Sequence, residues 1–190
     1  MALPDYQSLM LPLLKYAGQK AGELKTQDAV EFLAKEFQLS ENDLQEMLPS
    51  GVQTTFVNRV GWASTYLKKA GLLESTRRGY FQISERGKEV LRTPPEKIDL
   101  KFLERFPEFV QFRNTKGTRS RGKESDTEDR NFDESATPLE SLERAYEGLR
   151  AQLTEDILTR LKQVSPAHFE KIVIELIVKM GYGGSRSDAG

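Results

Sequence analysis

The chain has 190 residues, which is long enough for one ordinary domain or two small ones. It contains no cysteine and a single histidine, which excludes a disulfide-stapled scaffold, a thiolate zinc site and a cysteine nucleophile, and argues against clusters of histidine ligands. The 28 Lys and Arg residues nearly balance the 29 Asp and Glu residues, so the net charge is −1.

The charges are distributed unevenly along the chain. Residues 1–53 carry a net charge of −4, residues 54–92 carry +5 and residues 93–190 carry −2. The positive charge is therefore concentrated in one short segment, which favours a nucleic-acid partner despite the near-zero total. The sequence contains no apolar run of about 20 residues and no signal peptide, so we expect a cytoplasmic protein without a membrane partner.

Apolar residues spaced by three and four positions predict two amphipathic helices in the first 40 residues. The first extends over about 5–17 and contains Pro12, which should kink or shorten it. The second begins at Thr26 and ends near Gln38. A cap signal at residues 40–43 then predicts a short helix, which the Pro-Ser-Gly run that follows should end.

Within the basic segment the hydrophobic period changes from helical to that of β-strands. A longer helix is predicted from Thr54 or Thr55 to Gly71. Two short strands, 72–75 and 80–83, follow with a basic, glycine-containing turn between them, which predicts a β-hairpin.

A short capped helix at 84–92 ends the first unit. A hairpin directly after the third main helix is typical of a winged helix-turn-helix domain, and we predict that fold for residues 1–92. The predicted fold class is mainly α with a small β-hairpin.

This fold predicts a DNA-binding surface. The second helix of a helix-turn-helix lies in the major groove, and a neighbouring hairpin can contact phosphates or the minor groove. The predicted surface combines polar side chains that can contact base edges with cations that can bind phosphates. Its members are Thr54, Thr55, Asn58, Arg59, Ser64, Lys68, Lys69, Arg77 and Arg78. A solvated basic face on a protein-interaction module is the alternative, and we favour DNA because charge and fold agree.

Residues 93–137 are predicted to be a linker, largely disordered from residue 113. Phe132 is the only large apolar side chain between residues 113 and 136, so this part cannot form a core. The earlier part contains four phenylalanines at helical spacing, which should form a short helix that packs on a neighbouring domain.

Two further helices are predicted after the linker. The first starts at Pro138 and has one apolar face. Ser165 caps the second, which is apolar over most of its circumference and ends at Gly181. A helix of that kind must be covered on several sides, and because the sequence supplies little to cover it, we expect residues 138–190 to be an incomplete domain.

No complete catalytic constellation occurs in the sequence. The one histidine allows no Ser-His-Asp arrangement, and no glycine-rich phosphate loop is present. Acid-x-Lys fragments occur at Glu23 and Asp99, but both lie outside any apolar strand that could hold them in a metal-dependent nuclease site, so we interpret them as chance matches. No metal site is predicted for this chain.

Several segments together are typical of a known family. The first group is Pro-Asp-Tyr at 4–6, Asn-Arg-Val-Gly-Trp-Ala at 58–63, Leu-Lys-Lys-Ala-Gly-Leu at 67–72 and Arg-Gly-Tyr-Phe at 78–81. These segments resemble the N-terminal domain of Mrr-type restriction endonucleases. The segments that resemble the entry into the catalytic domain of that family are Ser-Pro-Ala-His-Phe-Glu at 165–170 and Met-Gly-Tyr-Gly-Gly at 180–184.

The resemblance implies a type IV, modification-dependent restriction enzyme. In that family a winged-helix domain binds DNA, and a PD-(D/E)xK-type α/β domain cleaves methylated DNA with a divalent metal, usually magnesium. The strands that carry the catalytic Asp and the Gln/Glu-x-Lys motif follow the Gly-Tyr-Gly-Gly turn in relatives, and this sequence ends before them. The one family site residue that it matches is Glu170, which in relatives lies near the metal.

We therefore expect the DNA-binding N-terminal part of such an enzyme, as a truncated product or a partial sequence, that does not cut DNA by itself. The expected partner is double-stranded, methylated DNA, and Mg²⁺ is expected for the full-length family but no cofactor for this chain alone. The alternative is a non-catalytic winged-helix transcriptional regulator or interaction module that dimerises through its C-terminal helices. Both interpretations allow a homo-oligomer.

Overall fold

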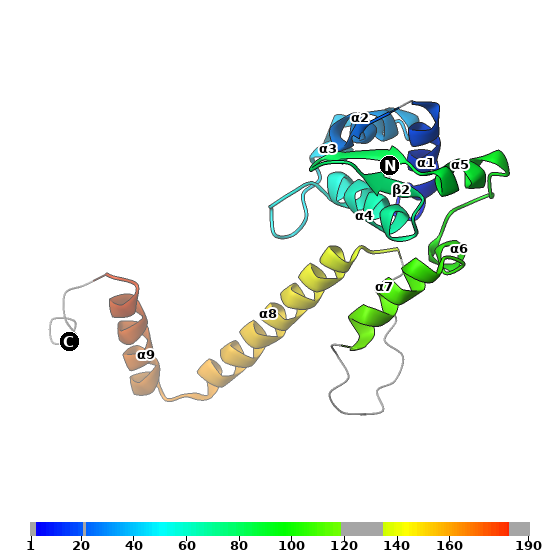
Figure 1. Ribbon diagram of the computed structural model, residues 1–190. Coiled ribbons are helices and arrows are strands. Elements are labelled where there is room, and N and C mark those ends of the chain that lie inside the picture. The colour runs from blue at the N-terminus through cyan, green and yellow to red at the C-terminus, as the bar shows by residue number, and fades with distance from the viewer. Residues whose placement is uncertain (1–2, 21, 119–134, 183–190) are drawn as a thin grey trace. The chain divides into compact units, whose positions relative to one another are not determined.

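The computed structural model of the chain describes residues 3–20, 22–118 and 135–182. The chain divides into two compact units, Met1–Glu143 and Arg144–Gly190. The described residues are mostly helical with one small antiparallel sheet of three strands (Figure 1), which confirms the predicted fold class in its coarse form. None of the helices in these ranges is long and apolar enough to cross a membrane.

The first unit contains most of the helices and strands. In chain order they are α1 (Met10–Gln19), β1 (Leu24–Lys25), α2 (Thr26–Glu36), α3 (Glu41–Gln45), α4 (Thr55–Lys69), β2 (Leu73–Ser75), β3 (Tyr80–Ile83), α5 (Glu85–Arg92), α6 (Leu100–Leu103) and α7 (Pro107–Thr118). The helix α8 (Pro138–Gln163) begins in this unit, and α9 (Pro166–Lys179) lies in the second.

Local capping chemistry fixes several helix ends where the sequence predicts them. At the start of α3, the Ser40 hydroxyl accepts from the Asp43 N–H and the Asp43 carboxylate accepts from the Ser40 N–H, which is a capping box. The Ser84 hydroxyl caps α5 by accepting from the Gly87 N–H at 3.0 Å. Gly71, with a φ of +72°, follows the end of α4, where a left-handed residue is favoured.

The first helix starts later than predicted. It begins at Met10, because the Asp5 carboxylate accepts hydrogen bonds from the N–H and the hydroxyl of Ser8 and holds the preceding residues in a turn. Pro12 thus lies in the first helical turn, where the N–H groups have no intrahelical partner and its missing N–H removes no hydrogen bond.

The sheet contains a strand that the sequence pattern does not predict. β3 pairs with β2 to form the predicted hairpin and with β1 on its other side, which gives the order β1-β3-β2. In the β1 pairing Leu24 lies opposite Phe81, and both are buried. The Thr26 N–H and hydroxyl both donate to the Gly79 carbonyl, at 2.9 and 3.1 Å, and thereby attach the start of α2 to the hairpin turn.

One hydrophobic core holds the first unit together. It lies where α1, α2 and α4 meet the sheet (Figure 1), and its largest fully buried side chains include Phe56, Leu67 and Phe81. Phe109 of α7 is also fully buried and makes an edge contact with the Tyr66 ring of α4, with the ring centroids 5.7 Å apart. The phenylalanine-containing helix therefore packs on the first domain, as predicted.

The predicted linker is more structured than expected where it is described. Residues 113–118 continue α7 instead of being disordered, and Ala136 and Thr137 are buried in the first unit. Residues 119–134 lie outside the described residues. The correction arises because α7 and the start of α8 gain contacts with α4 that the composition of the segment does not reveal.

The second unit contains the rest of α8 and all of α9. The Ser165 hydroxyl accepts from the His168 N–H and Pro166 occupies the first helical turn, so α9 starts as predicted. Large apolar side chains on both helices are exposed. They are Tyr146, Leu149, Leu153, Ile157 and Leu158 of α8 and Phe169, Leu176 and Ile177 of α9.

Candidate nucleic-acid interface

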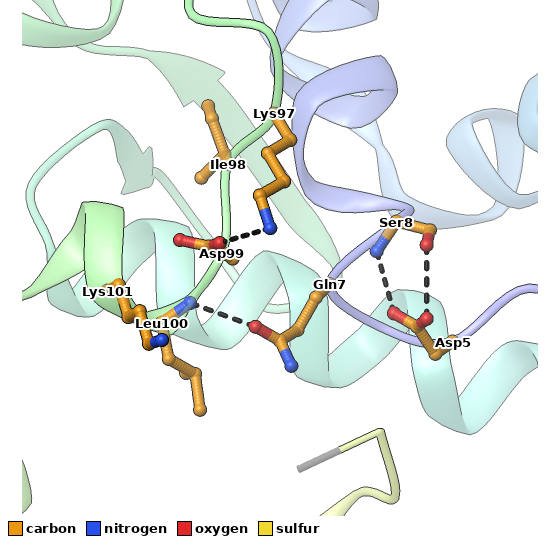
Figure 2. A pocket seen from close by; sticks show the side chains of 8 residues that line it. All are labelled: Asp5, Gln7, Ser8, Lys97, Ile98, Asp99, Leu100 and Lys101. Atoms are coloured by element: carbon orange, nitrogen blue, oxygen red, sulfur yellow. Dashed lines mark hydrogen bonds and ion pairs between the residues drawn. The ribbon is translucent and has the colours of Figure 1, made fainter.

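A small polar pocket lies beside the start of α1 and before α6 (Figure 2), with a volume of about 270 Å³. The groups in its wall bind one another. The Gln7 side chain accepts from the Leu100 N–H at 2.9 Å, and Asp99 pairs with Lys97 at 2.9 Å. The Asp99 carboxylate also accepts a hydrogen bond from the Phe102 N–H and thereby caps α6. This capping role explains why an aspartate occupies this position of the acid-x-Lys fragment.

Four of the eight cations of segment 54–92 form ion pairs with carboxylates of the same unit. The pairs are Arg59–Glu140 at 2.7 Å, Arg77–Glu23 at 3.1 Å, Arg86–Glu108 at 3.0 Å and Lys88–Glu85 at 2.6 Å. Three of these carboxylates come from outside the segment and lower its local net charge from +5 to +2. The other four cations, which make no ion pair within the described residues, are Lys68, Lys69, Arg78 and Arg92.

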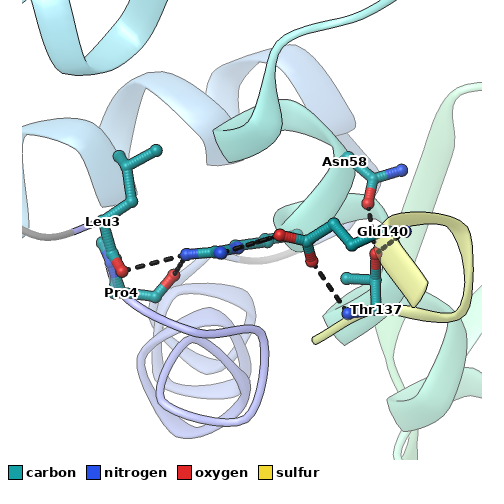
Figure 3. A network of polar contacts seen from close by, with 6 residues as sticks. Leu3, Pro4, Asn58, Thr137 and Glu140 are labelled. Atoms are coloured by element: carbon teal, nitrogen blue, oxygen red, sulfur yellow. Dashed lines mark hydrogen bonds and ion pairs between the residues drawn. The ribbon is translucent and has the colours of Figure 1, made fainter. Parts of the chain in front are cut away.

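Hydrogen bonds place Arg59 in a buried network that joins α4 to the start of α8, and Figure 3 shows its partners Leu3, Pro4 and Glu140. Its Nε and Nη2 donate to Oε1 of Glu140 at 3.1 and 2.7 Å, and its Nη1 donates to the carbonyls of Leu3 and Pro4 at 2.9 and 3.1 Å. The side chains of Arg59 and Glu140 are 14% and 5% exposed. The guanidinium is therefore directed into the protein and not toward solvent.

The same network holds Asn58. Its Oδ1 accepts from the Thr137 hydroxyl at 2.7 Å. Thr137 and Glu140 also bind each other, since the Thr137 N–H donates to the Glu140 carboxylate and the Glu140 N–H donates to the Thr137 hydroxyl. Burial raises the pKa of Glu140, but the hydrogen bonds from Arg59 and Thr137 and the charge of Arg59 outweigh it and hold the pKa below its ordinary value.

The structure thus removes several predicted DNA contacts from the surface. Thr55, Asn58 and Ser64 are buried, Arg59 is engaged in the network, and the Thr54 hydroxyl oxygen is also buried. In this conformation their polar groups face the interior of the unit, and a contact of any of them with DNA stays a prediction. The physical reason is that α7 and residues 136–140 cover the side of α4 on which Asn58 and Arg59 lie, and a local pattern cannot show a contact between residues 79 positions apart.

Four predicted residues remain accessible at the end of α4 and in the hairpin turn. Lys68 Nζ lies 5.5 Å from the centre of the Phe81 ring, and burial lowers the pKa of this lysine. Lys69 is exposed, with its Nζ 5.0 Å from the centre of the Phe112 ring. Arg77 stacks on Tyr80 and pairs with Glu23, whereas the neighbouring Arg78 is exposed. The binding of DNA by these four residues stays a prediction.

One side of α4 stays partly open, with Val57 exposed and the other three residues half-buried, which the sequence pattern does not indicate. The open strip consists of Val57, Gly61, Thr65 and Lys68, whose spacing of four, four and three positions places them on one side of the helix. Val57 is 39% exposed, and a Cβ at Gly61 would meet no surrounding atom within 4 Å. The Thr65 hydroxyl donates to the Gly61 carbonyl at 2.9 Å. The α4 helix contains no acidic residue.

The predicted catalytic residue Glu170 lies exposed in the first turns of α9. A Mg²⁺ site needs carboxylates that converge on one ion. Within the described ranges no group of three or more His, Asp or Glu side chains could hold a metal ion. The described residues therefore do not fit a magnesium site, and the role of Glu170 stays a prediction.

Comparison with known proteins gives one family and one relative. Residues 6–93 match the family model described as the Mrr N-terminal domain. The chain is 28% identical over 191 aligned residues to the type IV methyl-directed restriction enzyme EcoKMrr of Escherichia coli (strain K12), an alignment that covers 99% of this chain and 62% of the relative. The chain thus spans less than two thirds of the length of that relative. No solved structure gives a significant match.

Proposed function

We propose that the chain is the DNA-binding N-terminal part of a methyl-directed restriction enzyme of the Mrr family, because residues 6–93 match the Mrr N-terminal domain and the chain is 28% identical to one such enzyme. The family match carries the proposal, since it covers the segment that contains the cations Lys68, Lys69 and Arg78. The partner is double-stranded DNA, methylated as the name of the relative implies, and the setting is the cytoplasm.

The order of elements supports a winged helix-turn-helix as the DNA-binding fold. Helices α1, α2 and α4 precede the β2–β3 hairpin, and β1 pairs with the hairpin from its other side. In such a domain α4 is the recognition helix and the hairpin is the wing. Because Asn58 and Arg59 are engaged inside the unit, the proposed surface moves to the open strip of α4, the cations at its C-terminal end and the hairpin turn.

Salt dependence tests the proposed surface. Each phosphate contact contributes about −0.9 to the slope of log affinity against log salt, so the double variant Lys68→Gln/Arg78→Gln should bind a duplex more weakly with a slope reduced by about 1.8. The matched control is Lys15→Gln/Lys35→Gln, which removes two exposed cations from the helices that pack on the buried face of α4. Fluorescence anisotropy measures both. Equal slopes for the two double variants would reject this surface.

The parent activity is metal-dependent phosphodiester hydrolysis, in which α8 and α9 would be helices of a PD-(D/E)xK-type domain. We propose that this chain alone does not cut DNA. The test is a nicking assay on methylated plasmid with Mg²⁺, with Glu170→Ala beside the wild type. Cleavage by the wild-type chain that Glu170→Ala abolishes would overturn this part of the proposal.

The second candidate function, an interaction module that dimerises, is favoured by the exposed apolar side chains of α8. Leu142, Tyr146, Leu149 and Leu153 follow one another at four, three and four positions and are 59–67% exposed. That spacing is typical of a helix that pairs with another helix. If a second copy covers them, light scattering should show a dimer that Leu149→Glu/Leu153→Glu converts to a monomer. A monomeric wild type would remove this candidate.

A further inference from the structure

We propose that Arg59 provides an oxyanion site on α4 that takes a DNA phosphate, and that the chain's own Glu140 occupies this site as an autoinhibitory contact. Glu140 belongs to residues 136–140, the strap, which docks on α4 through hydrogen bonds. The inference rests on the proposed function and deepens it, because it states how access of DNA to α4 is regulated. A docked strap and a bound phosphate exclude each other at Arg59.

The first step is that the Arg59 guanidinium is held in place without its counter-ion. Its Nη1 donates to the Leu3 and Pro4 carbonyls at 2.9 and 3.1 Å, and Leu3 and Pro4 lie on the opposite side from Glu140 in Figure 3. Its Nε and Nη2 both donate to Oε1 of Glu140, at 3.1 and 2.7 Å. These two donors form the fork that arginine presents to a carboxylate or to a phosphate. When Glu140 leaves, the fork is still positioned to receive another oxyanion.

The second step is that polar contacts hold the strap to α4. Ala136 is the one apolar side chain of the strap that is buried. The other buried side chains of the strap are Thr137 and Glu140, and both of them bind polar side chains of α4. A buried ion pair is often no more stabilising than apolar packing of the same size, because both charges lose their hydration. A segment held in this way can be displaced by a ligand that brings the same polar groups.

The third step is that DNA brings those groups. The Glu140 carboxylate presents oxygen acceptors to Arg59, as a phosphate does. The Thr137 hydroxyl donates to Oδ1 of Asn58 at 2.7 Å, a contact that the amino group of adenine can make in a duplex. The domain match contains Asn58 and Arg59 and ends at residue 93, so their present partners come from outside the matched domain.

The cost of releasing the strap is also compensated when a phosphate replaces it. Loss of Glu140 alone is unfavourable, because it leaves the Arg59 charge without a counter-charge in a place where that side chain is only 14% exposed. A phosphate in the same place supplies the missing negative charge. The exchange therefore requires a polyanion, and a neutral ligand would not displace the carboxylate.

Salt-dependent binding to a duplex of about 20 base pairs, measured by fluorescence anisotropy on the full 190-residue chain, tests the inference. Glu140→Ala removes the occupant of the site. The matched control Glu143→Ala removes an equal charge from the next turn of α8 and leaves the Arg59 contacts in place. Glu140→Ala should bind about tenfold more tightly than Glu143→Ala at low salt, with a slope of log affinity against log salt that is steeper by about 0.9. The double variant Arg59→Gln/Glu140→Ala should lose both gains.

Hydrogen exchange on the wild-type chain tests the same exclusion without a substitution. Thr137 and Glu140 are 0% and 4% exposed in the docked strap. Saturation with the duplex should make their N–H groups exchange faster, because a ligand that binds one state draws the chain into it. Unchanged protection of these two N–H groups at saturation would overturn the inference, even if Glu140→Ala fails to fold.

The results separate this inference from the proposed function. Circular dichroism melting identifies the variants that are folded. If Lys68→Gln/Arg78→Gln weakens binding but folded Glu140→Ala has the affinity and slope of Glu143→Ala, the inference is overturned and the proposed function stands. If neither the wild-type chain nor Glu140→Ala binds a duplex at any salt concentration, the proposed function is overturned, and the inference with it.

Discussion

Removal of the Glu140 carboxylate should destabilise the first unit strongly, even though Glu140 lies outside the segment that matches the family model. In Glu140→Gln, one neutral oxygen replaces two charged oxygens that accept two hydrogen bonds from Arg59 and one from the Thr137 N–H. The Arg59 charge then stays buried without its counter-charge.

The magnitude follows from the burial of the pair. Breaking a buried ion pair by removing one partner costs about 3–5 kcal/mol. The expected loss lies below that range, at about 2–3 kcal/mol, because the Leu3 and Pro4 carbonyls still accept from Arg59 and the glutamine keeps one acceptor. For a unit of this size each kcal/mol shifts the melting temperature by about 2–4 °C, so the expected shift is about 4–12 °C.

Acid should weaken this contribution in the wild type. The pKa of Glu140 is lowered in the folded chain, so its contribution to stability is present above the pKa of the unfolded chain, about 4.3, and is lost as the pH falls through the folded value. Glu140→Gln lacks the titrating group. The difference in unfolding free energy between the two proteins should therefore be full at pH 7 and shrink below about pH 4.

Chemical denaturation at about pH 7 and about pH 3.5 measures this difference. Glu143→Gln is the control, since Glu143 lies one turn further along α8 and accepts hydrogen bonds from the exposed Ser50 at 2.7 and 3.1 Å. It should cost less than about 1 kcal/mol. The reasoning is refuted if Glu140→Gln matches Glu143→Gln in stability at neutral pH, or if the loss in Glu140→Gln is independent of pH.

Two further predictions concern packing. Gly87→Ala should destabilise the unit by about 2 kcal/mol or more, because its Cβ would lie 2.2 Å from the Leu72 carbonyl oxygen, and a wild-type melting temperature would contradict this. Phe109→Ala should cost about 3–5 kcal/mol, since the ring is fully buried against Tyr66. Hydrogen exchange should then show faster exchange in α7, and protection equal to that of the wild type would disprove the docking of this helix.

The local features of the fold could be predicted from the sequence because their causes are local. The Ser40 capping box, the glycine after α4 and the Ser84 cap each depend on residues within a few positions of one another. The hairpin could also be predicted from the sequence, because its two strands and its turn are contiguous. The strand β1 could not be predicted, because two residues are too few to show an alternating pattern and only their pairing with β3 defines the strand.

The candidate site was harder to predict from the sequence. Segments far along the chain decide which side of a helix is covered and which side is exposed. The sequence correctly indicates that α4 and the hairpin carry the basic residues, but Asn58 and Arg59 are covered by residues about 80 positions later. A Thr-x-x-Glu capping box at residues 137–140 could have indicated where α8 starts. It could not have indicated that the same threonine and glutamate bind α4.

The docking of α7 and of residues 136–143 on α4 also means that the homologous domain and the folding unit have different ends. The family match stops at residue 93, whereas the compact unit continues to Glu143. A fragment that ended at residue 93 would lack the α7 ring that packs on Tyr66. It would separate Asn58 from Thr137 and Arg59 from Glu140, while Arg59 would keep the Leu3 and Pro4 carbonyls as acceptors. Under the proposed function, the shorter fragment would offer DNA an Asn58 side chain that the longer chain keeps engaged, so the two would differ in how they bind.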